Sequence, residues 1–120
     1  GIENLYPYML DAAGKGKVSY ETVVRLCAHN PAAIFGCTEK GDIAVGKDAD
    51  IVVYDPEKDF TISVKNMHSD YDHMIWEGKK LHGYPIRTYL RGKLVFDDGK
   101  YVGSYGEGKF IKRAKHLPKG

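Results

Sequence analysis

The sequence predicts a fold in which a few helices are followed by a small antiparallel sheet. Apolar residues recur at three- and four-residue spacing in the first third of the chain, which indicates helices. After Gly36, short apolar runs are separated by tight turns, which indicates strands. Because a self-standing α/β domain would alternate strands with helices, this order favours the last helices of a larger barrel joined to an appended β domain.

The first third of the chain carries signals for three short helices. The first should end in the glycine-containing segment 14–17, and its apolar face should consist of Leu5, Tyr8, Met9 and Ala12. Ser19 is suited to cap a second helix, whose apolar stripe would contain Val23, Val24, Leu26 and Cys27. Asn30 should cap a third helix with Pro31 in its first position, and Gly36 should end it as a left-handed residue.

The rest of the chain predicts strands and one long loop. Strands are expected at residues 43–45, 51–54, 60–64, 86–90, 93–97 and 100–104. Asp55-Pro56 should end the second of them, because proline cannot donate to a central ladder. Turns at Arg91-Gly92 and Asp98-Gly99 should join the last three strands, since Asp-Gly suits the positive φ angles of the tightest hairpin turns. Residues 66–83 form a polar, aromatic loop that is long enough to be functional or interfacial.

The composition limits the partners and the location that we expect. With 18 basic and 16 acidic residues, the formal net charge of +2 predicts neither nucleic acid nor an anionic membrane as a partner. No apolar run approaches the roughly 20 residues of a membrane span. The two cysteines, Cys27 and Cys37, favour reduced thiols and a cytoplasmic protein. The basic residues Lys109, Lys112, Arg113, Lys115 and Lys119 are interpreted as a solvated tail. The chain begins with Gly1 rather than methionine, from which we expect an interior start point.

The side-chain patterns for catalysis or metal binding are weak. The five histidines have no spacing with a known ligand geometry, so we interpret them as hydrogen-bonding residues; they are His29, His68, His73, His82 and His116. No serine lies in a Gly-x-Ser-x-Gly motif. The Gly-rich segment 103–108 lacks the strand-to-helix context of a phosphate-binding loop. Asp50 is expected to accept backbone N–H groups of its own turn, residues 46–50, and Trp76 to lie in the core.

Several motifs together resemble one family. They are Asn30-Pro31-Ala32-Ala33-Ile34-Phe35-Gly36, the segment from Gly41 to Pro56 with its Ala49-Asp50 pair, His68-Ser69, Asp72, Glu77-Gly78, the Arg91-Gly92-Lys93 turn and the tail from Gly106 to Arg113. The pattern resembles the C-terminal portion of the cyclic amidohydrolases over essentially the whole chain, and it is most similar to their dihydropyrimidinase/D-hydantoinase branch.

The resemblance implies an α/β parent made of a TIM-like barrel plus a β-sandwich. Residues 1–38 would be the last barrel helices, and residues 39–65 and 84–105 would be strands of the sandwich lobe. Residues 66–83 would be a polar, aromatic loop or short helix, and residues 106–120 a C-terminal tail. Helices taken from a barrel should expose apolar surface in the isolated chain, around Leu5, Met9, Val23 and Leu26.

The resemblance also implies an activity for the parent. Such enzymes use two divalent metal ions, usually zinc, to activate a hydroxide, open dihydropyrimidine or hydantoin rings to N-carbamoyl amino acids, and are usually homotetramers. Their metal ligands and catalytic groups belong to segments before Gly1. No catalytic or metal residue is therefore assigned here, and the chain alone is expected to bind no metal and to be inactive.

The motif positions of this chain are then structural, and its partners would be the rest of its own barrel, a small cyclic ureide and further copies of the parent. These positions are Asn30, Pro31, Gly36, Gly41, Gly46, Ala49, Asp50, Asp55, Pro56, Glu77, Gly78, Gly92, Gly106, Gly108 and Arg113. Two alternatives remain open: a non-catalytic scaffold of the same fold, and an independent β interaction module.

Overall fold

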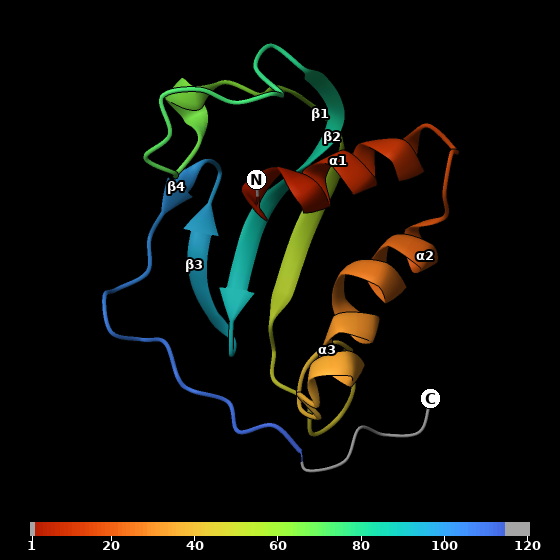
Figure 1. The fold of residues 1–120 in the computed structure, drawn as a ribbon, viewed down its shortest axis with the longest axis vertical. Helices are drawn as coiled ribbons and strands as arrows, with labels where there is room; N and C mark the ends of the chain where they lie inside the picture. Colours follow the sequence, from red (N-terminus) through yellow and green to blue (C-terminus); the bar gives the residue numbers. More distant parts are fainter. Residues whose placement is uncertain (1, 115–120) are drawn as a thin grey trace.

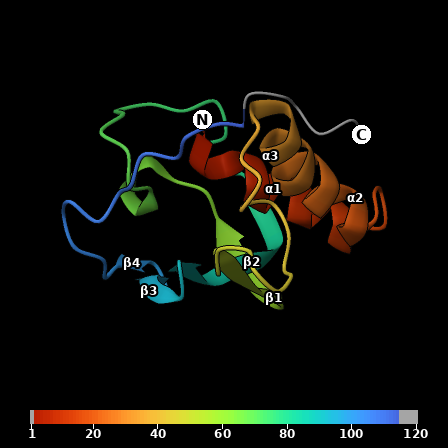
Figure 2. The same ribbon diagram turned by 90° about the horizontal axis from the view of Figure 1, so that it is seen from below.

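The three α-helices precede all four strands in the described residues, as the sequence predicts. The structure is a computed structural model that describes residues 2–114; Gly1, His116 and the basic Lys115 and Lys119 lie outside the described residues. The helical part comprises α1 (Ile2–Gly14), α2 (Tyr20–Val24), a π-helical turn (Arg25–His29) and α3 (Asn30–Phe35). The sheet comprises β1 (Ile51–Thr61), β2 (Lys80–Leu90), β3 (Lys93–Asp97) and β4 (Lys100–Tyr101), and a 3₁₀ turn (Val64–Asn66) follows β1. Figures 1 and 2 show the helices gathered on one face of the sheet.

The second and third helices form one continuous run. Ser19 caps its start as predicted, because its hydroxyl accepts the Thr22 N–H at 3.1 Å. Gly36 ends the run with φ +69°, also as predicted. The prediction that Asn30 caps a separate helix is wrong, since Asn30 is itself helical and its N–H donates to the Arg25 carbonyl in the wider π pattern. Pro31 has no N–H to donate to the preceding helical turn, and the wider π-helical turn accommodates this missing hydrogen bond.

The first helix buries a different face from the one predicted. Its buried residues are Asn4, Pro7, Leu10, Asp11 and Ala13. Leu5, from the predicted apolar face, is 61% exposed. Leu10 and Ala13 pack against Val23 of α2, which is fully buried, so the stripe of the second helix is correct at that position. The face of α1 is set by contact with β2, to which Asp11 is hydrogen-bonded, rather than by apolar spacing alone.

The sheet is antiparallel with the order β1-β2-β3-β4. The prediction that Asp55-Pro56 ends a strand is wrong, because β1 continues to Thr61 with an irregularity between Asp55 and Asp59. Since β1 is an edge strand, the missing N–H of Pro56 is tolerated. The expected strand at residues 43–45 is absent from the described residues, which form bends and turns there.

The loop after β1 is shorter than expected and contributes to a second small core. β2 begins at Lys80, opposite Thr61, so the loop ends at residue 79 instead of 83. Ile62, Leu81 and Tyr84 are buried together, and Trp76 packs on them from the loop, as predicted for a core residue. The two turns of the meander are confirmed, with φ +48° at Arg91 and +42° at Asp98. The last strand is shorter than predicted and ends at Tyr101.

Candidate functional site

The Ala49-Asp50 pair joins the start of β1 to the β2–β3 turn. One carboxylate oxygen of Asp50 accepts the Arg91 N–H at 2.9 Å, and the Ala49 carbonyl accepts the Gly92 N–H at 2.9 Å. Asp50 accepts a backbone N–H, as predicted, but its partner lies 41 residues away and not within its own turn. These two bonds hold Arg91 in its positive-φ conformation, which residues other than glycine seldom adopt.

Lys40 completes this junction. Its ammonium lies 2.5 Å from Asp50 and 2.7 Å from Asp48, and only 16% of its side chain is exposed. Burial alone would raise the pKa of Asp50, but the bonds from Lys40 and Arg91 prevail and hold that pKa below its ordinary value. Burial would likewise lower the pKa of Lys40, and the two carboxylates raise it instead. Lys40, Asp48 and Asp50 are thus charged groups paired with one another, and none of the three is a free acid or base.

Glu77-Gly78 closes the loop between β1 and β2. The two oxygens of Glu77 accept the Ser63 hydroxyl and the Val64 N–H, both at 2.8 Å. The Gly78 N–H donates to the Ile62 carbonyl at 2.8 Å. The carboxylate therefore caps the 3₁₀ turn that follows β1, which is a structural role.

The tail segment 106–114 returns across the molecule to the end of α3. The Arg91 guanidinium donates to the Glu107 carbonyl at 2.5 Å, and the Glu107 carboxylate pairs with Lys93 and accepts the Ser104 N–H. The Gly36 carbonyl accepts the Ala114 N–H at 3.0 Å. Glu107 and Ala114 of the tail thus connect the tail to the meander and to the end of α3.

Gly41 permits a close approach between its loop and α3. Its φ is +89°, and a Cβ there would lie 2.7 Å from the Ala32 Cβ and 2.9 Å from the Ala28 carbonyl oxygen. The glycine is needed for both its conformation and its lack of a side chain. By contrast, a Cβ at Gly46, Gly92, Gly106 or Gly108 would meet nothing within 4 Å.

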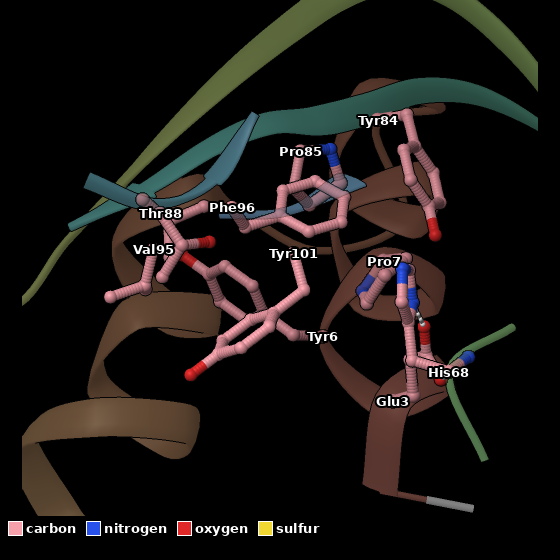
Figure 3. Close-up of a pocket in the computed structure, with 11 residues that line it drawn as sticks. Glu3, Tyr6, Pro7, His68, Tyr84, Pro85, Thr88, Val95, Phe96 and Tyr101 are labelled. Atoms are coloured by element: carbon pink, nitrogen blue, oxygen red, sulfur yellow. Dashed lines mark hydrogen bonds and ion pairs between the residues drawn. The ribbon is translucent and has the colours of Figure 1, made fainter. Parts of the chain in front are cut away.

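A groove of about 260 Å³ lies between α1 and the sheet (Figure 3). Its walls are mostly apolar and include Tyr6 and Pro7 of α1 and Phe96 of β3, while Glu3 and His68 stand together at one side. The side chain of His68 bonds Glu3 at 2.7 Å, and the His68 N–H donates to the same carboxylate at 2.9 Å. Sequence reasoning missed this pair, because the partners are 65 residues apart and no local pattern links them.

Each described histidine has one carboxylate within hydrogen-bond distance, and His82 also lies 3.9 Å from the carboxylate of Glu57. The pairs are His29–Asp42, His68–Glu3, His73–Asp72 and His82–Asp59, at 2.6–2.9 Å. Within residues 2–114, no group of three or more His, Cys, Asp or Glu side chains could hold a metal ion. The residues described here do not fit a two-metal centre, and no ligand or catalytic group is assigned to them. The thiols of Cys27 and Cys37 are not joined to each other.

The described helices also include none that is both long and apolar enough to cross a bilayer.

The comparison with protein families matches residues 10–96 to the amidohydrolase family. The D-hydantoinase of Ralstonia pickettii is 42% identical over 117 residues, which is 97% of this chain and 26% of that protein. The D-phenylhydantoinase of an Escherichia coli strain is 34% identical over 120 residues, 98% of this chain and again 26% of the relative. The chain therefore spans about a quarter of the length of these relatives.

Solved structures give the same result. A D-hydantoinase (dihydropyrimidinase) from Thermus sp. has a TM-score of 0.83 at 39% identity, over 93% of this chain and 24% of that one. An L-hydantoinase (dihydropyrimidinase) from Arthrobacter aurescens has a TM-score of 0.85 at 31% identity, over 89% of this chain and 24% of that one. The helices and the sheet therefore reproduce a part of the hydantoinase fold. The chain belongs to the amidohydrolase family, and it is homologous to D-hydantoinases and dihydropyrimidinases over about a quarter of their length.

Proposed function

We propose that this chain is the C-terminal scaffold of a cyclic-amide hydrolase of the dihydropyrimidinase/hydantoinase type. The observation that carries the proposal is its similarity to D-hydantoinases along nearly the whole chain. The parent would open a hydantoin or dihydropyrimidine ring to an N-carbamoyl amino acid with the help of two divalent metal ions, most simply zinc. The segment described here would supply no metal ligand. Its part would be to support the catalytic barrel.

The junctions between distant segments support a scaffold role. The carboxylates of the motif residues Asp50 and Glu77, and that of Glu107 between two motif glycines, each accept a backbone N–H group. Carboxylates that accept backbone N–H groups hold the backbone in a fixed geometry.

The exposed apolar residues of the helices fit a location at the end of a barrel. Ile34 is 62% exposed and Phe35 58% exposed at the end of α3. Of the predicted apolar surface, Leu5 and Leu26 are exposed, whereas the prediction is wrong for Val23, which is fully buried. Adjacent exposed apolar side chains of this kind mark surfaces that another part of a protein covers. In our proposal, α1–α3 are the last barrel helices, the sheet belongs to the sandwich lobe, and the remainder of the barrel covers these side chains. The parent would be a cytoplasmic homo-oligomer.

Substrate choice would lie outside this quarter of the parent. Proteins described as D-hydantoinase, L-hydantoinase and dihydropyrimidinase all match this chain, with TM-scores of 0.81–0.85 in three of them. A segment whose backbone is common to enzymes with different names is suited to support the catalytic barrel and not to distinguish between substrates.

A hybrid enzyme tests the proposal. The corresponding quarter of the Ralstonia pickettii D-hydantoinase is replaced by residues 1–120, and hydantoin opening is measured with added zinc. We expect the hybrid to fold, load metal and turn over substrate, and the 120-residue chain alone to be inactive. An Asp50→Ala hybrid should give less folded enzyme, because the Arg91 N–H loses its acceptor, whereas Asp70→Ala, in the exposed loop, should match the parent hybrid.

Two results would contradict the proposal. Metal-dependent turnover by the isolated chain would show that it carries its own catalytic groups. A folded, metal-loaded hybrid without turnover would favour a non-catalytic scaffold of the same fold.

A further inference from the structure

His68 connects three segments that are distant in the sequence. It follows the 3₁₀ turn after β1, its ring and its backbone N–H both bond Glu3 at the start of α1, and its Nε2 lies 3.1 Å from the Gly99 carbonyl in the β3–β4 turn. The ring also meets Phe96 edge-on, with centroids 5.6 Å apart. Figure 3 shows Glu3 and His68 joined at one side of the groove between α1 and the sheet. One side chain therefore fastens both walls of that groove.

The two ring contacts require a particular charge state. A carbonyl oxygen only accepts, so Nε2 must carry a proton to bond Gly99. An ionised carboxylate also only accepts, so Nδ1 must carry a proton to bond Glu3. A neutral imidazole has one N–H and can satisfy only one of the two oxygens. The complete set of contacts therefore belongs to the imidazolium form.

We propose that His68 is a proton-dependent latch that fastens one end of the groove when its ring carries both protons and releases it when the ring loses one. Release would free either the β3–β4 turn or the start of α1, according to which nitrogen keeps its proton. This device does not depend on the proposed enzymatic activity, and its test uses no hydantoin.

The surroundings of His68 favour the charged form. The hydrogen bond to Glu3 raises the pKa of His68 above its ordinary value, against the opposing effect of burial. The other ionisable groups lining the groove are the phenols of Tyr6, Tyr84 and Tyr101. Burial and Glu3 raise the pKa of Tyr84 to about 12, so this phenol stays neutral where histidine titrates. Asp98, next to Gly99, is paired with Lys58.

The sign of the pH dependence follows from this shift. A raised pKa in the folded state means that the contribution to stability is complete below the ordinary histidine pKa of about 6.5. It is lost as the pH rises through the raised value. Each unit by which the His68 pKa is raised corresponds to a tenfold stronger preference of the proton for the latched state.

The test follows the His68 ring and backbone by NMR in the 120-residue chain between pH 5.5 and 9. We expect His68 to titrate above the ordinary histidine pKa of about 6.5. His73 lies in the same loop, has a side chain 88% exposed and bonds only its neighbour Asp72 among the described contacts, so it provides a matched position for substitution. The hydrogen-exchange protection factor of the His68 amide should fall about tenfold as the ring loses its proton, consistent with the loss of one charge-assisted bond.

Matched variants separate the latch from general loosening. Glu3→Gln should return the His68 titration toward the ordinary value and remove the pH dependence of protection, while His73→Gln should leave both unchanged. The proposal is overturned if His68 titrates at or below the ordinary histidine pKa of about 6.5, if its protection is independent of pH, or if Glu3→Gln has no effect. An unfolded wild-type spectrum would overturn it too, because the latch requires α1 packed on the sheet.

Discussion

Replacing Gly83 with alanine should destabilise the fold well beyond a typical surface substitution. Gly83 is buried in β2 with φ +88°, and a Cβ there would lie 2.0 Å from the Tyr54 hydroxyl oxygen and 2.7 Å from the ring carbon that carries it. Strain of this kind in the backbone costs about 1–3 kcal/mol. Forcing an extra carbon into a packed site costs about 1–3 kcal/mol more. We therefore expect the free energy of unfolding to fall by roughly 2–6 kcal/mol.

Gly46→Ala provides the matched control. Its φ is +86°, and a Cβ there would meet nothing within 4 Å, so only the backbone cost applies. Urea unfolding of both variants gives the two losses, and an unchanged m value shows that stability has changed without a change in the surface exposed. Adding Tyr54→Phe to Gly83→Ala removes the nearest atom and should restore part of the loss. Equal losses at Gly83 and Gly46 would refute the close approach of Tyr54 to β2.

Two further predictions concern carboxylates that join distant segments. Asp11 is buried, bonds Lys15 at 2.6 Å and accepts the His82 N–H at 2.9 Å, so Asp11→Ala should cost about 1–3 kcal/mol in urea unfolding by leaving that N–H unpaired. Asp11→Asn, which keeps an acceptor, should cost less; equal costs would contradict this role. The pKa of Asp50 is held down by Lys40 and Arg91 against the effect of burial, so its contribution is present above the ordinary Asp pKa of about 3.9 and is lost as the pH falls through the lowered value. Thermal unfolding between pH 2 and 6 should therefore be less acid-sensitive in Asp50→Asn, and identical pH profiles would contradict the junction.

Several local signals in the sequence predicted local structure correctly, although those at Asn30 and at residues 43–45 did not. Ser19 and Gly36 mark helix ends because each acts on its own backbone, through a hydroxyl acceptor or through a left-handed φ. The Arg91-Gly92 and Asp98-Gly99 turns are likewise decided by the φ angles of the residues within them. The order of helices before strands could also be predicted, because the spacing of apolar residues within each segment is a local pattern too.

Features that depend on distant partners could not be predicted in this way. The buried face of α1 is decided by the bond between Asp11 and His82, which are 71 residues apart. Pro56 was expected to end a strand, but that rule applies to central strands and β1 is an edge. Asp50 was predicted to accept a backbone N–H of its own turn, but it accepts that of Arg91, and the sequence spacing gives no sign that the two meet. The motifs marked important positions without revealing which positions pair.

The irregularity of β1 at Pro56 has a consequence for self-association. An exposed edge strand offers unpaired backbone groups that a second chain could extend into a growing, aggregating sheet. The register of β1 with β2 shifts between Val53 and Tyr54 and again between Asp55 and Asp59, so the regular stretches cover only residues 51–53, 54–55 and 59–61. An incoming strand would meet a residue that cannot donate at the centre of its template, followed by the charged run from Glu57 to Asp59. Pro56 therefore disfavours the addition of further strands to this edge, as in fibril growth, while the native pairing of β1 with β2 is kept.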